Sequence, residues 1–191
     1  MTPLETITGW IEDGRAQRFP DPDAMTLATA TPSGVPSARI VLCRGIDARG
    51  LRFFTNYESR KGGELADNPH AAAVFYWPTL GRQARVEGRI ERLPAKESDA
   101  YFESRPRGHQ LSAWASSQSH PIADRNEVLV RMDEATLRYE GVPVPRPAYW
   151  GGYLLRPVAI ELWMQGESRL HDRVRHELTG DGVWKSQRLS P

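Results

Sequence analysis

The sequence predicts a mainly β fold, an antiparallel barrel or strongly curled sheet with peripheral helices. Its strand-like segments follow one another in runs, which differs from the strict strand–helix alternation of a parallel α/β sheet. Residues 82–93 alternate polar and apolar side chains, and residues 70–77 form a continuous apolar run. A chain of 191 residues can bury a sizeable core. We therefore assign residues 1–20 to an N-terminal helix and residues 21–191 to a single domain.

The first third of the chain is predicted to form an amphipathic helix and a meander of strands. Apolar side chains recur at helical spacing in residues 1–20, namely Leu4, Ile7, Trp10 and Ile11. After a linker, strands are expected at residues 25–31, 37–44 and 51–56, separated by turns at 32–36 and 47–50. A short helix should follow at residues 58–67, with Ser59 as its N-cap and Asn68-Pro69 at its end.

Two long strands, three helices and further strands are predicted in the remainder of the chain. The run at residues 70–77 is expected to be buried on both faces, whereas the strand at 82–93 should bury only one. Helices are predicted at residues 94–104, 110–116 and 124–140, the last being the longest and capped by Asp124. Strands should then follow at residues 153–156, 159–164 and 183–189.

The charge balance argues against a polycationic protein. The 25 Lys+Arg residues and 24 Asp+Glu residues leave a formal net charge of +1, so binding to nucleic acid or to an acidic membrane surface is not expected. Only Lys61, Lys96 and Lys185 are lysines, so the other basic residues are arginines. Genome composition explains many of these arginines, but arginine also binds small anions in a two-pronged geometry.

The sequence also constrains compartment and metal chemistry. No apolar run approaches the roughly 20 residues of a membrane span, and the N-terminus lacks the layout of a signal peptide. We therefore expect a cytoplasmic protein. The single cysteine, Cys43, excludes an internal disulfide framework and a Cys-based metal cluster. We expect Cys43 to be a buried structural thiol and expect no metal site.

Four basic clusters lie next to predicted strand or helix ends. They are Arg39 to Arg44, Tyr57 to Gly63, Ser104 to Arg107 and Ser168 to Arg173. The second opens a helix, where backbone N–H groups can cradle an anion, and cations there oppose the helix dipole unless an anion binds. The third is also explained by compensation of a helix C-terminus.

The fourth cluster combines cationic and titratable side chains. In an extended segment, Arg169, His171 and Arg173 would project from one face. They could grip an anion and supply an acid or a base near neutral pH. A solvated surface strand would show the same pattern.

Several motifs in the chain together resemble one enzyme family. They include Ser59-Arg-Lys-Gly62, Tyr101-Phe-Glu-Ser-Arg-Pro-Arg107, Trp150-Gly-Gly-Tyr153 and Arg169-Leu-His-Asp-Arg173. From about residue 20 to its end, the chain resembles the pyridoxamine 5′-phosphate oxidase family of vitamin B6 metabolism. The resemblance implies an FMN-binding split barrel and a homodimer with FMN at the subunit interface. It also implies oxidation of pyridoxamine or pyridoxine 5′-phosphate to pyridoxal 5′-phosphate, with O2 as acceptor and peroxide as product.

The same resemblance implies a set of site residues. The FMN phosphate would be bound by Arg39, Arg60 and Lys61. The FMN ring and ribityl chain would be bound by Ile40, Val41, Leu42, Phe54, Thr55, Gln83, Gln118, Ser119, Trp163 and Arg173. The substrate phosphate would be bound by Arg44, Tyr101, Arg105 and His109. The catalytic residues would be Arg169 and His171, which would lie over the substrate ring.

Three departures from the family pattern concern the substrate. Arg44 stands where the family normally has a lysine, and His109 replaces a small serine. The chain also begins where the family's lid over the substrate would already have ended. These departures favour, as an alternative, a divergent FMN-dependent oxidase of a reduced heterocycle, similar to those of phenazine biosynthesis. A non-catalytic flavin-binding module is a further hypothesis, but it would not require Arg169 and His171.

Overall fold

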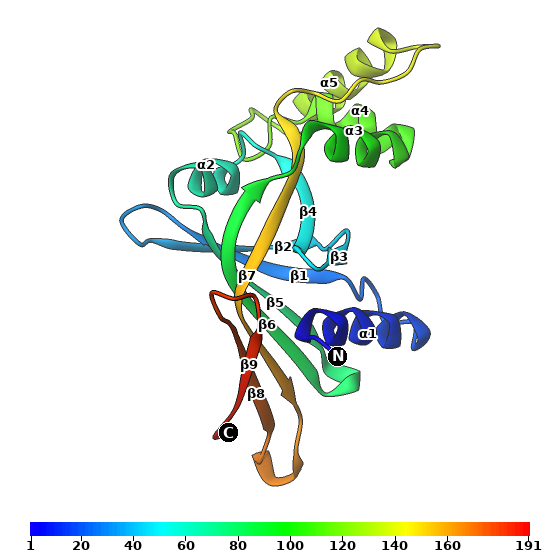
Figure 1. The fold of residues 1–191 in the computed structure, drawn as a ribbon. Coiled ribbons are helices and arrows are strands. Elements are labelled where there is room, and N and C mark those ends of the chain that lie inside the picture. The colour runs from blue at the N-terminus through cyan, green and yellow to red at the C-terminus, as the bar shows by residue number, and fades with distance from the viewer.

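A nine-stranded antiparallel sheet forms the centre of the computed structural model, which describes residues 1–191 (Figure 1). The strand order is β2-β1-β5-β6-β7-β4-β3, with β8 paired to β7 and β9 paired to β8. The strands are β1 (Ala24–Ala30), β2 (Pro36–Leu42), β3 (Ile46–Asp47), β4 (Gly50–Asn56), β5 (His70–Trp77), β6 (Arg82–Arg92), β7 (Trp150–Met164), β8 (Asp172–Leu178) and β9 (Trp184–Leu189). The mainly β prediction is confirmed.

Helices surround this sheet at its periphery (Figure 1). They are α1 (Pro3–Ala16), α2 (Arg60–Asp67), α3 (Ala95–Ser104), α4 (Arg107–Ala115) and α5 (Arg125–Arg138), with short 3₁₀ turns η1 (Pro78–Leu80) and η2 (Glu167–Arg169). The predicted caps are confirmed, because the Ser59 side chain accepts from Gly62 N and the Asp124 side chain accepts from Glu127 N. None of the helices combines the length and apolar character of a membrane span.

Two apolar clusters stabilise the molecule. The larger lies between α1 and the sheet, where Trp10 meets Trp77 edge to face at 5.9 Å. The apolar face of α1 is thus part of the main core. The smaller joins α3, α4 and α5 to the start of β7 through residues such as Phe102, Tyr139 and Trp150. Cys43 is buried, as expected, and burial raises the pKa of its thiol to about 11.

β7 is one strand where the sequence pattern predicted two. The predicted segments 153–156 and 159–164 both belong to its 15 residues. Pro157 does not interrupt β7, because it lies where the strand paired to one edge of β7 changes from β4 to β8. Residues up to Leu155 pair with β4, and residues from Ala159 pair with β8. A proline is tolerated at such a break because no full ladder of hydrogen bonds is required there.

The expectation that β5 is buried on both faces is wrong. Phe75 and Trp77 are buried with Ala71 and Ala73, but Tyr76 is 56% exposed. The strand therefore alternates between a core face and an open face, as strands of an antiparallel sheet commonly do. An apolar run alone does not distinguish these two arrangements.

Several element boundaries also differ from the predictions. α1 ends at Ala16, and α5 equals it in length rather than exceeding it. The predicted turn at residues 47–50 includes part of β3, which pairs with β4. α4 begins at Arg107 rather than at residue 110, so only Arg105 and Pro106 separate it from α3. This tight bend places Arg105 beside the candidate site.

Candidate active site

One cavity of about 1140 Å³ collects most of the predicted site residues. It lies among β2, β4, the start of α2 and the bend between α3 and α4. Its lining includes predicted FMN-binding residues, namely Arg39, Ile40, Val41, Leu42, Phe54, Thr55, Arg60, Lys61, Gln118 and Ser119. It also includes all four predicted substrate-phosphate residues, Arg44, Tyr101, Arg105 and His109.

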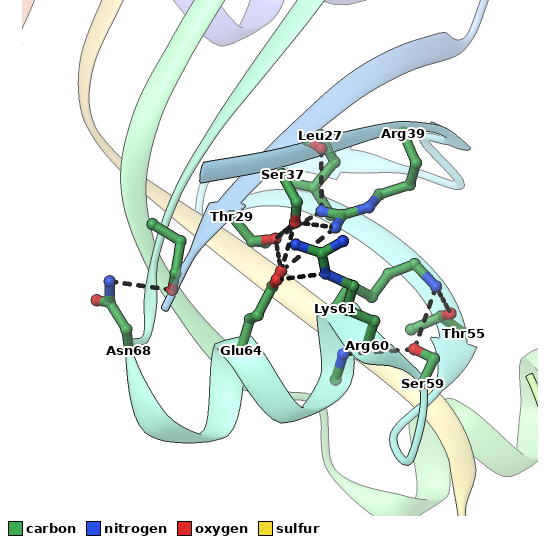
Figure 2. A network of polar contacts seen from close by, with 12 residues as sticks. Leu27, Thr29, Ser37, Arg39, Thr55, Ser59, Arg60, Lys61, Glu64 and Asn68 are labelled. Atoms are coloured by element: carbon green, nitrogen blue, oxygen red, sulfur yellow. Dashed lines mark hydrogen bonds and ion pairs between the residues drawn. The ribbon is translucent and has the colours of Figure 1, made fainter. Parts of the chain in front are cut away.

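The start of α2 positions a buried lysine beside this cavity (Figure 2). Lys61 Nζ donates hydrogen bonds to Thr55 Oγ1 at 3.0 Å, Ser59 Oγ at 3.2 Å and Gln118 Oε1 at 2.9 Å. Burial and the nearby charge of Arg39 lower the pKa of Lys61 to about 8. A lysine with this pKa remains largely charged at neutral pH and attracts anions into the cavity.

Two arginines from different elements meet at one carboxylate next to Lys61 (Figure 2). Arg39 Nη2, from β2, lies 3.3 Å from Glu64 Oε2, and Arg60 Nε, from α2, donates to Glu64 Oε1 at 2.9 Å. Arg39 also donates to Thr29 Oγ1 at 2.6 Å and to Ser37 Oγ at 2.6 Å. Glu64 is not among the residues predicted from the sequence, although its i,i+4 spacing from Arg60 is a recognisable signal for an ion pair.

A second group of cations lines the same cavity near α3 and α4. The Arg105 guanidinium lies 4.5 Å above the Trp150 ring, and its buried Nη1 has no hydrogen-bond partner. Tyr101 stacks on Phe54 with ring centroids 3.8 Å apart. An unpartnered buried N–H costs free energy, so Arg105 Nη1 is well placed to donate a hydrogen bond to an anionic ligand.

The two residues that depart from the family pattern both line this cavity. Arg44 Nη1 donates to Oδ2 of the buried Asp23 at 2.9 Å. Part of its charge is therefore compensated within the chain. His109 is exposed in the first turn of α4. The substrate-phosphate part of the cavity consequently contains Arg44, whose charge is partly compensated, Arg105, which has an unpartnered nitrogen, and the imidazole of His109.

The remaining predicted residues form a second cluster elsewhere on the sheet. Gln83, Trp163 and Arg173 are direct neighbours in one row across β6, β7 and β8. Arg173 Nε donates to the buried Glu161 at 2.9 Å. The His171 ring lies 4.6 Å from the Trp163 ring. Strand register therefore brings three predicted residues together, and a ring contact with Trp163 adds His171.

Local backbone geometry contradicts one expectation about this cluster. Arg169, His171 and Arg173 do not form a simple alternating face, because Ser168 and Arg169 have φ angles of 52° and 65°. This left-handed turn precedes β8, and Arg169 lies exposed on it. His171 Nδ1 accepts a hydrogen bond from Gly166 N at 3.3 Å. The neutral ring therefore carries its proton on Nε2.

The two clusters do not share a cavity within one chain. None of the second-cluster residues Gln83, Trp163, Arg169, His171 and Arg173 lines the cavity beside α2. Figure 1 shows that β8 and β9 project from the opposite end of the molecule to α3, α4 and α5. One chain thus presents two separate parts of the predicted site.

Comparison with known proteins identifies the family. Residues 11–147 match the family model described as pyridoxamine 5′-phosphate oxidase. Residues 150–191 match the pyridoxine 5′-phosphate oxidase C-terminal dimerisation region. Both the first part of the chain and its last strands therefore carry family-specific sequence.

Individual relatives are similar in sequence over the full chain. The pyridoxine/pyridoxamine 5′-phosphate oxidase of Salinibacter ruber is 48% identical over 191 residues, covering 99% of this chain and 89% of the relative. The Bordetella petrii protein of the same name is 50% identical over 190 residues, covering 100% of this chain and 90% of the relative.

A solved structure agrees as well. PhzG from Burkholderia lata 383, in complex with tetrahydrophenazine-1-carboxylic acid, has a TM-score of 0.93 at 34% identity, covering 99% of this chain and 92% of that chain. The expected fold and family are both confirmed. The chain belongs to the pyridoxamine 5′-phosphate oxidase family of FMN-dependent oxidoreductases and has its split-barrel fold.

Proposed function

We propose that the protein oxidises pyridoxamine 5′-phosphate and pyridoxine 5′-phosphate to pyridoxal 5′-phosphate, with O2 as acceptor and hydrogen peroxide as product. The main support is one cavity that contains two separate groups of cations. Arg39, Arg60 and Lys61 form the first group, and Arg44 and Arg105 form the second. Two anion sites in one cavity suit a phosphorylated cofactor beside a phosphorylated substrate. The names of the full-length relatives agree with this substrate class.

The residues of the cavity fit FMN. The three cations of the first group and the carboxylate of Glu64 leave a formal charge of +2, which complements a phosphate dianion. The terminal nitrogens of Arg60 have no acceptor within the chain. The apolar side chains of residues 40–42 and Phe54 offer a surface for a flavin ring. When bound, FMN supplies the redox chemistry of a hydride acceptor.

A homodimer would complete this site. The C-terminal dimerisation region spans residues 150–191, so it contains Trp163, Arg169, His171 and Arg173. A two-fold axis exchanges equivalent surfaces between two copies. The second cluster of each copy would then complete the cavity of its partner, which gives two equal sites. This arrangement accounts for the separation of the two clusters within one chain.

The protein side chains would bind, orient and polarise the substrate. Arg105 would bind the substrate phosphate with a guanidinium fork, assisted by Arg44 and Tyr101. Arg169 would stabilise negative charge near the substrate ring, and His171 would donate a hydrogen bond from Nε2. Holding the donor carbon in a reactive geometry is the main catalytic task left to the protein.

Peroxide formation by the FMN-loaded protein tests this proposal. We expect turnover of pyridoxamine and pyridoxine 5′-phosphate and much weaker turnover of pyridoxine without its phosphate. Bound flavin with no turnover of either phosphate would refute the proposed substrate. Peroxide release and pyridoxal 5′-phosphate formation should be measured together, because a one-to-one ratio verifies the acceptor.

The divergent oxidase is a second candidate for a specific reason. Arg44 is compensated by Asp23, and His109 adds bulk to the substrate pocket. The similar Burkholderia lata protein was solved with a tricyclic carboxylic acid. Oxidation of reduced phenazine carboxylic acids, combined with inactivity toward the vitamin B6 phosphates, would favour this candidate.

A further inference from the structure

We propose that Glu64 is a positioning residue that orients Arg60, together with Arg39, to bind the phosphate of the flavin cofactor. This role rests on the proposed FMN site. Glu64 lies one helical turn after Arg60, and Figure 2 shows its carboxylate facing the guanidinium groups of both arginines. The residue is only 7% exposed. A buried carboxylate is unfavourable unless it is paired and hydrogen-bonded, so this one requires a specific explanation.

Both oxygens of Glu64 are used, and each faces a different arginine. Oε1 accepts from Arg60 Nε at 2.9 Å. Oε2 accepts from Ser37 Oγ at 2.7 Å, from Thr29 Oγ1 and from Arg39 Nη2 at 3.3 Å. These hydrogen bonds outweigh the cost of burial and lower the pKa of Glu64 to about 2. The group is therefore a fixed anion at neutral pH.

The way in which Arg60 is held points to a ligand. Glu64 engages only its Nε, and the two terminal nitrogens have no acceptor within the chain. The Arg60 side chain is 61% exposed, so without this contact it would sample many rotamers. Fixing the inner edge of the guanidinium orients its outer edge, and a guanidinium edge matches two phosphate oxygens.

Two opposing effects decide the result of neutralising Glu64. Its negative charge repels a phosphate, so its removal favours binding. Its removal also frees Arg60 and weakens the restraint on Arg39, which disfavours binding. The loss of arginine orientation should be the larger effect on FMN affinity. Two guanidinium groups already compensate the charge of the carboxylate, so its repulsion of the phosphate is small, whereas hydrogen bonds to phosphate depend strongly on direction.

Replacement of Glu64 in the full-length protein, with FMN and riboflavin as probes, tests this inference. Glu64→Gln retains the size but presents an N–H group to one of the two arginines. We expect its dissociation constant for FMN to rise about tenfold or more, with little change for riboflavin, which lacks the phosphate. Quenching of flavin fluorescence measures both constants. Glu97→Gln is the matched control, because Glu97 pairs with Arg49 outside the cavity.

A double variant separates positioning from a general structural role. In an Arg60→Met background, Glu64→Gln should cause a much smaller further loss of FMN affinity. If Glu64→Gln does not fold, Glu64→Asp retains the charge but shortens the reach to Arg60 Nε, and it should show the same FMN-selective loss.

Three results would overturn the proposal. They are unchanged or tighter FMN binding by Glu64→Gln, equal weakening of FMN and riboflavin, and additive effects of the Arg60 and Glu64 substitutions. Failure of the unaltered protein to bind FMN would instead overturn the proposed cofactor, and this role with it.

Discussion

Replacing Arg105 with methionine should lower substrate affinity with little change in protein stability. Arg105 Nη1 is buried and has no hydrogen-bond partner within the chain, and the guanidinium lies over the rings of Trp150 and Phe102. One N–H group of this side chain therefore has no acceptor within the protein. Arg105→Met removes the charge and the donor while keeping an apolar stem against the ring.

The magnitudes follow from these contacts. Loss of one charge-assisted hydrogen bond to phosphate costs about 1.5–3 kcal/mol, which raises KM for a phosphorylated substrate about 10- to 100-fold. Removing a buried unpartnered N–H gains about 1–3 kcal/mol, and losing the cation–π contacts with Trp150 and Phe102 costs about 0.5–2 kcal/mol each. These contributions nearly cancel, so the stability of the ligand-free variant should change by no more than about 1 kcal/mol, a shift in Tm within about 2–4 °C for this size.

Steady-state peroxide release and calorimetry test both parts of this prediction. KM should rise for pyridoxine 5′-phosphate but not for pyridoxine, because only the former offers a phosphate to Arg105. Arg89→Met is a suitable control, since Arg89 is exposed on β6 and does not line the cavity. An unchanged KM for the phosphorylated substrate, or a Tm of the ligand-free variant lowered by more than about 4 °C, would refute the reasoning.

Four further predictions concern the fold, the cofactor end of the cavity, to which two of them apply, and the composite site. Gly88→Ala should lower Tm markedly, because a Cβ there would lie 2.0 Å from the Arg156 carbonyl oxygen, and thermal melting measures this. Lys61 has a pKa lowered to about 8, so FMN affinity should fall as the pH rises above 8, and Lys61→Met should flatten that profile. The unfolded chain binds the Lys61 proton more tightly than the folded chain does, so the contribution of this group to the free energy of unfolding should increase from pH 8 toward 10.5. Denaturant unfolding of the unaltered protein and of Lys61→Met across this pH range measures the difference. Finally, Arg105→Met and His171→Ala proteins should both have little activity at pyridoxine 5′-phosphate concentrations far below KM. Unfolded together and refolded, they should regain about a quarter of the activity of the unaltered protein under these conditions, since half of the dimers then carry one intact site. No recovery, despite demonstrated formation of mixed dimers, would contradict the composite site.

Local patterns in the sequence were sufficient for much of the fold. The cap at Ser59, the cap at Asp124 and the alternation of residues 82–93 depend on neighbours along the chain, and each is present in the structure. The motif at residues 59–62 likewise identified the cations at the start of α2, because a helix begins there whatever packs around it. Family motifs supplied the expected fold and enzyme class.

Other features depend on which distant segments become neighbours. The row of Gln83, Trp163 and Arg173 arises from strand register, and the continuity of β7 through Pro157 arises from its exchange of partners. Residue spacing alone specifies neither. Simple alternation predicted that Arg169 and Arg173 project from one face, but the left-handed turn at Arg169 breaks this alternation.

The clearest division between sequence and structure lies at the candidate site itself. The sequence by itself determined which cations gather at the opening of α2 and which motif carries Arg169 and His171. Only the tertiary structure decided that Glu64 bridges two arginines and that the site residues form two clusters apart from each other. The physical reason is that helix and strand patterns arise from short-range sterics and hydrogen bonding, whereas ion pairs and cavities arise from contacts between segments far apart in the chain.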